Sequence, residues 1–131
     1  MITEDYVSFE TAKLLKEKGF DEPCFRYAES KGIYGSGKWT VANVTGGGIG
    51  VPTLQIAMKW LREVHKLGVF PTTYYREINR NAKHNYGSTI VMLDTYEVIG
   101  NGKNIEDYTF EAETYEETTE KAIRYCLENL I

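Results

Sequence analysis

The chain has 131 residues, of which 42% are hydrophobic and 26% charged, and its formal net charge is −4. This length is sufficient to bury a core without disulfides or metals, and the composition is typical of a soluble globular protein. The apolar runs are too short for a transmembrane helix, the opening MITEDY lacks a secretory-signal pattern, and the two cysteines form no CxxC motif. We therefore expect one domain, residues 1–131, in a reducing cytoplasmic setting.

The first predicted element is a helix over residues 7–20. Ser8 is a suitable N-cap, Glu10 lies in the first turn, and Gly19 is expected to end the helix. Its few apolar residues require the helix to pack on something larger.

A β-hairpin is expected next. Residues 24–29 and 38–44 alternate in the manner of strands, and residues 30–38 form the turn between them. Residues 45–51, TGGGIGV, are expected to form a loop or a distorted strand edge.

Residues 52–68 carry the clearest helical pattern in the chain. At 100° per residue one side holds nine mostly apolar residues: Leu54, Ile56, Ala57, Met58, Trp60, Leu61, Val64, His65 and Leu67. This arc covers more than half of the helical wheel, so we expect the helix to be flanked by several elements. Pro52 fits the first turn, Gly68 fits the C-terminal stop, and His65 is expected to be partly buried with a hydrogen-bond partner.

The second half of the chain predicts strands and then a helix. Strands are expected within residues 69–80, 88–99 and, more weakly, 105–113. Residues 114–131 read as the last helix. Thr114 and Glu117 have capping-box spacing, one face is formed by Tyr115, Thr119, Ala122, Ile123, Cys126 and Leu130, and two ion pairs at i,i+4 spacing are expected: Glu117–Lys121 and Glu120–Arg124.

The predicted element order is α-β-β-α-β-β-(β)-α. Strand pairs joined by short turns must be antiparallel. We therefore expect an α+β fold, a single domain with an antiparallel sheet of four to five strands packed with three helices.

Charge is unevenly distributed along the chain. Residues 59–93 hold six bases and two acids, whereas residues 94–131 hold three bases and ten acids. Three bases share the outer face of the central helix and form a candidate site for an anionic partner: Lys59, Arg62 and Lys66. Further bases and aromatic residues follow at Tyr74, Tyr75, Arg76, Arg80, Lys83 and Tyr86, so phosphate binding with base stacking is one interpretation and a solvated helix face is the other.

The remaining motifs give no enzyme signal. Residues 32–38, GIYGSGK, match the spacing GxxxxGK, but Trp39 stands where a Ser or Thr is needed and a β-like segment follows, so we interpret them as a hairpin loop. Residues 46–50 precede a helix but lack GxGxxG spacing, which favours a connector over an anion site. Neither metal-ligand spacing nor a nucleophile motif occurs, and we predict no catalytic residue, metal or cofactor.

The segments VSFETAKLLKEKGFDEPCF, PTLQIAMKWLREVHK and TYEETTEKAIRYCLENLI together show a resemblance. The chain resembles a family of small uncharacterised proteins of Bacteroides-type genomes, associated with prophages or other mobile elements. The resemblance covers about half the chain and excludes the GGGIG loop. It implies a single domain and carries over no catalytic or binding residue.

Three functional hypotheses follow. The first is a non-enzymatic protein-interaction module that binds a protein partner or a second copy of itself. The chain has ten tyrosines and two tryptophans, and these residues are frequent at interfaces. The second is a nucleic-acid-associated accessory protein of a mobile element. The third is an enzyme with an unrecognised site. No membrane partner is expected.

Overall fold

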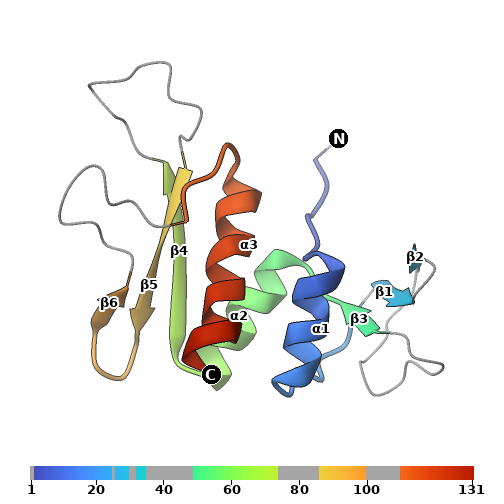
Figure 1. Ribbon diagram of the computed structural model, residues 1–131, viewed down its shortest axis with the longest axis horizontal. Helices are drawn as coiled ribbons and strands as arrows, with labels where there is room; N and C mark the ends of the chain where they lie inside the picture. The colour runs from blue at the N-terminus through green and yellow to red at the C-terminus, as the bar shows by residue number, and fades with distance from the viewer. Residues whose placement is uncertain (1, 25, 30–31, 35–48, 74–85, 100–109) are drawn as a thin grey trace.

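The protein has an α+β fold in which the described helices lie to one side of a three-stranded sheet (Figure 1). The computed structural model describes residues 2–24, 26–29, 32–34, 49–73, 86–99 and 110–131. Its helices are α1 (Phe9–Glu17), α2 (Leu54–Val64) and α3 (Tyr115–Tyr125), and α3 continues as a π-helical turn, η1 (Cys126–Leu130). The α+β class and the three predicted helices are thus confirmed.

The described strands form two antiparallel sheets of three strands each, not one sheet of four to five. The first has the order β2 (Gly32–Tyr34), β1 (Arg26–Glu29), β3 (Ile49–Val51). The second has the order β4 (Leu67–Thr73), β5 (Tyr86–Met92), β6 (Glu97–Ile99). The sheets lie at opposite ends of the molecule (Figure 1). Strand β2 falls inside the predicted turn, whereas the strand predicted at residues 38–44 lies outside the described residues.

Helix α1 has the predicted cap and an unpredicted partner. The Ser8 hydroxyl accepts a hydrogen bond from the Thr11 N–H, as an N-cap side chain should. In a capping box, a Glu or Gln three residues on would accept the Ser8 N–H, but Thr11 occupies that position. Glu120 of α3 supplies the acceptor instead. Its Oε1 lies 2.6 Å from the Ser8 nitrogen and 2.7 Å from the Thr11 hydroxyl.

Helix α2 is shorter than the periodicity predicts. It begins after the N-cap Thr53, so Pro52 precedes the helix and the prediction that it lies in the first turn is wrong. It ends at Val64, and Lys66 has a φ of 56°. Gly68 is not the helix stop, because Leu67–Thr73 pairs with β5 over seven residues. This long ladder outweighs the helical pattern and the roughly 1–2 kcal/mol cost of a left-handed residue.

The β-rich run at residues 88–99 is a hairpin rather than one continuous strand. Strands β5 and β6 pair with Val91 opposite Val98, and the chain reverses through Tyr96, which has a φ of 58°. The Tyr96 N–H donates to the Met92 carbonyl oxygen at 2.7 Å, which closes the turn.

Helix α3 is fixed at its start by the predicted cap. The Thr114 hydroxyl accepts from the Glu117 N–H at 3.1 Å. The predicted inner face is buried at Thr119, Ala122, Ile123 and Cys126, whereas Tyr115 is exposed. The predicted i,i+4 partners have other contacts: Lys121 donates to the Glu111 carbonyl, and Arg124 lies 3.3 Å from Glu128.

One cluster of buried side chains joins these elements. It includes residues from every described helix and from both sheets, among them Leu15, Val51, Leu61, Ile90 and Leu127. Trp60 packs edge-to-face against Phe20 and His65, with ring centroids 5.5 and 4.7 Å away. Among the described helices, none combines the length and apolar composition that crossing a bilayer requires.

Candidate functional site

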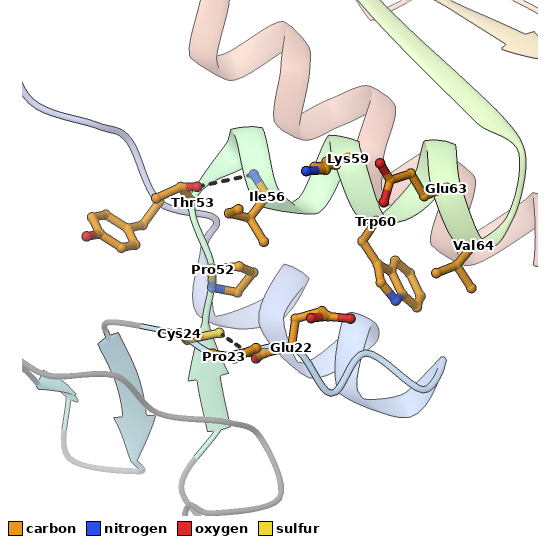
Figure 2. Close-up of a pocket in the computed structure, with 11 residues that line it drawn as sticks. Glu22, Pro23, Cys24, Pro52, Thr53, Ile56, Lys59, Trp60, Glu63 and Val64 are labelled. Carbon is orange, nitrogen blue, oxygen red and sulfur yellow. Dashed lines mark hydrogen bonds between the residues drawn. The ribbon is translucent and has the colours of Figure 1, made fainter.

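A groove of about 490 Å³ lies between α2 and the segment that joins α1 to β1. One side is formed by α2, the other by Glu22, Pro23 and Cys24, and the end by Tyr6, Pro52 and Thr53. In Figure 2, Ile56, Trp60 and Val64 project from α2 towards the segment that carries Glu22. The volume is within the range of ligand-binding clefts.

The α2 side of the groove is one helical stripe with the spacing i, i+3, i+4, i+7, i+8: Ile56, Lys59, Trp60, Glu63 and Val64. Trp60 is buried and forms the floor, whereas Ile56 and Val64 are 40% and 56% exposed. The sequence predicts burial for both, since they lie on the apolar arc. Within the groove they are instead accessible apolar groups on a rigid helix.

The end of the groove is fixed by the N-terminal segment, which pairs with the entry to α2. The Val7 N–H donates to the Pro52 carbonyl at 3.1 Å, and the Leu54 N–H donates to the Asp5 carbonyl at 2.9 Å. These bonds hold Tyr6 beside the groove. The guanidinium of Arg26 stacks on the Tyr6 ring, 3.9 Å from its centroid.

The groove has an apolar floor and charged edges. Glu22 lies on one side, and Lys59 and Glu63 lie one turn apart on α2. Among the described residues that line the groove, the charged groups are two carboxylates and one ammonium group, and the Arg26 guanidinium lies over Tyr6 at the groove end. Away from the Arg26 end, a ligand that carries an apolar group and a positive charge can pair with Glu22 or Glu63.

Cys24 lines the groove but is a poor nucleophile. Its side chain is buried, and its thiol donates to the Glu22 carbonyl with an Sγ–O distance of 3.4 Å. Burial, followed by the nearby Glu22 charge, raises the pKa of the Cys24 thiol to about 11. Thiolate is the reactive form, and at neutral pH this thiol holds its proton almost entirely. Cys126 is also a free buried thiol, and burial raises its pKa to about 12.

The predicted anionic-partner site is only partly assembled. Lys59 and Arg62 are both exposed on α2, and Lys59 belongs to the edge of the groove. Lys66 lies beyond the helix end, where its Nζ donates to the Glu63 carbonyl at 3.2 Å. The three bases therefore do not lie on one continuous helical face. Of the residues expected to extend the patch, Tyr86 lies in β5, and Tyr74, Tyr75, Arg76, Arg80 and Lys83 lie outside the described residues.

The other sequence motifs lie largely outside the described residues. The structure describes only Gly32–Tyr34 of the GxxxxGK match and Ile49–Val51 after the glycine run. Within the described residues, no three His, Cys, Asp or Glu side chains lie close enough together to hold a metal ion. His65 is partly buried as predicted, but its Nε2 is buried without the expected hydrogen bond in the described structure.

The groove could not be predicted from the sequence because its two sides are distant in the chain. The stripe on α2 lies at the boundary between the apolar and polar arcs of the helical wheel. This position is the feature of the sequence that could have indicated one side of the groove. Nothing local indicates that residues 22–24 lie opposite it.

Comparison of the chain with protein-family models, curated proteins and solved structures finds no match. The geometry and chemistry of the groove are therefore the basis on which a function is proposed.

Proposed function

We propose that this protein is a non-enzymatic interaction module that binds a short segment of a partner protein in the groove beside α2. The observation that carries the proposal is the exposure of Ile56 and Val64 on a groove-lining stripe whose floor is Trp60. Apolar side chains grouped in a concave site around a buried aromatic residue are the usual centre of a binding surface.

The size of the stripe indicates the length of the ligand. Ile56 and Val64 are eight residues apart in a helix, which corresponds to about 12 Å along its axis. An extended peptide covers this distance with about three to four residues. The groove therefore fits one or two side chains of a partner segment and the backbone between them.

The charges indicate the chemistry of that segment. A partner with an apolar residue next to Lys or Arg would place its cation near Glu22 and Glu63. Exposed charges steer association and select partners more than they increase affinity. We expect selectivity for basic over acidic segments, with the apolar contact supplying most of the affinity.

The test uses isotope-labelled protein and blocked tetrapeptides as probes, observed through amide chemical shifts. Leu-Lys-Leu-Lys should perturb α2 and residues 22–24 with a dissociation constant of about 0.1–1 mM. Ser-Lys-Ser-Lys controls for charge alone, and Leu-Glu-Leu-Glu controls for apolar content alone. Leu-Glu-Leu-Glu should bind about threefold more weakly, and Ser-Lys-Ser-Lys, which lacks the apolar contact, at least about tenfold more weakly.

Matched variants locate the site. Ile56→Glu should abolish binding, whereas Gln55→Glu places the same group on the same helix outside the groove and should leave binding unchanged. The double variant Glu22→Lys/Glu63→Lys should reverse the preference towards Leu-Glu-Leu-Glu. Equal binding by Ile56→Glu and wild type, or shifts confined to other elements, would contradict the proposal.

A further inference from the structure

The outer face of the sheet β4–β5–β6, which points away from the helices, is a second apolar surface. Strand alternation places buried Leu67, Val69 and Ile90 on the inner face. The outer face carries the alternate residues Gly68, Phe70, Thr72, Gly87, Thr89, Val91 and Val98. The described helices all lie on the other side of this sheet (Figure 1).

Large apolar side chains on this face are exposed to solvent. Phe70 is 52% exposed, Val98 is 43% exposed, and Tyr96 in the adjoining turn is 80% exposed. The Phe70 ring lies across Gly68, since a Cβ at Gly68 would be 2.7 Å from Phe70 Cε2 and 3.4 Å from Leu93 Cδ2. Because Gly68 has no side chain, the Phe70 ring can pack over it. Phe70, Leu93 and Val98 form one apolar surface with Val91.

We propose that this outer face binds the same face of a second copy of the chain and forms a two-fold symmetric dimer. In such a dimer each residue near the axis meets its own copy, so any charge there would face an identical charge. The seven strand residues of the outer face are all uncharged. The groove surface, with Glu22, Lys59 and Glu63, is much less suited to meeting its own copy.

The exposed apolar side chains would supply part of the area that such an interface buries. From their exposed fractions, Phe70, Tyr96 and Val98 offer about 350 Å² of side-chain surface per copy, or about 700 Å² for the pair. Specific interfaces bury about 1,200–2,000 Å² in total. The three side chains alone would provide about half of the smaller value, with threonines and turn residues forming the rim.

The dimer would leave the groove open. Residues 22–24 lie between α1 and β1, at the opposite end of the molecule from β4–β5–β6 (Figure 1). Two grooves would then face outwards, and a partner with two suitable segments would gain avidity from binding both.

Sedimentation velocity of the full chain from low micromolar to sub-millimolar concentration tests the proposal. The wild type should reach twice the chain mass of 15.0 kDa. Val98→Glu should remain a monomer, and Val98→Thr, which preserves side-chain shape and β-propensity, should weaken the dimer about tenfold. Ile56→Glu alters the groove and should leave the dimer intact, which separates this proposal from the peptide-binding one.

A mixture of Val98→Glu and Val98→Lys should recover part of the dimer, because the introduced charges are then opposite across the axis. A wild type that stays monomeric throughout, or a Val98→Thr variant as dimeric as the wild type, would overturn the proposal. Far-ultraviolet circular dichroism confirms that each variant is folded.

Discussion

Removal of the Glu120 carboxylate should destabilise the protein through the start of α1, a helix more than a hundred residues away in the chain. Glu120 Oε1 accepts both the Ser8 N–H and the Thr11 hydroxyl. Each hydrogen bond to a charged acceptor contributes about 1.5–3 kcal/mol. Glu120 is only half-buried, so hydrogen bonds to water offset part of the stabilisation by these two hydrogen bonds. We expect Glu120→Ala to lower the free energy of unfolding by about 2–3 kcal/mol.

Urea denaturation followed by circular dichroism measures the effect, with Glu117→Ala as the matched control. Glu117 lies one turn earlier on the same helix and is exposed, so its loss should cost less than about 0.5 kcal/mol. Glu120→Gln keeps an acceptor oxygen but loses its charge, and should cost about 1 kcal/mol.

A double-mutant cycle separates the contact from other effects of the substitution. Glu120→Ala and Thr11→Val should show a coupling energy of about 1 kcal/mol or more, because the two side chains bond directly. If Glu120→Ala costs no more than Glu117→Ala, or the cycle shows additivity, the carboxylate does not complete the α1 cap and the reasoning is refuted.

Other expectations can be checked with simple measurements. Leu61→Ala should cost about 2–5 kcal/mol in a urea melt because Leu61 is fully buried, whereas Val64→Ala on the same helix should cost under about 1 kcal/mol; equal costs would show that α2 is not central. Tyr96→Asn should stabilise the monomer by about 0.5–1 kcal/mol because Asn accepts a left-handed backbone more readily, and a loss of stability would contradict this. Iodoacetamide should label Cys24 about 100-fold more slowly in the folded than in the unfolded chain below pH 9.0. As the pH rises, the thiol of the unfolded chain loses its proton before the thiol of the folded chain does. The contribution of this thiol to the free energy of unfolding should therefore decline from pH 9.0 towards about 11. The last comparison uses a triple alanine variant of Lys59, Arg62 and Lys66. A salt titration of single-stranded DNA binding should show equally weak binding by the wild type and by this variant. If the wild type has a slope of about 2–3 in log binding constant against log salt concentration and the variant loses it, the nucleic-acid hypothesis is favoured.

The features of the fold that depend on residues three to four positions apart could be predicted from local patterns. The caps at Ser8 and Thr114 are local hydrogen bonds, so residue type and spacing predict them, and both are present. The period of 3.6 residues located α2 and α3, because it reflects burial of one side of each helix. The α+β class followed from the order of such segments.

Other features depend on contacts between segments that are distant in the chain. The end of α2 is set by the pairing of Leu67–Thr73 with Tyr86–Met92. A helical wheel shows one segment only and carries no information about this pairing. Glu120 has an obvious local partner in Arg124, yet its carboxylate accepts hydrogen bonds from Ser8 and Thr11. For Glu120 the competing local preference, an ion pair at i,i+4 spacing, is only a few tenths of a kcal/mol.

The groove belongs to the same class. Its α2 side is already present in the sequence as a stripe at the edge of the apolar arc, but a stripe alone does not distinguish a packed face from an accessible one. Whether Ile56 and Val64 are covered depends on where residues 22–24 lie, and that position is fixed by the packing of α1 and by the pairing of the N-terminal segment with Pro52–Leu54. Burial is a property of the whole fold, so only the assembled structure shows that these two apolar residues are exposed in a groove.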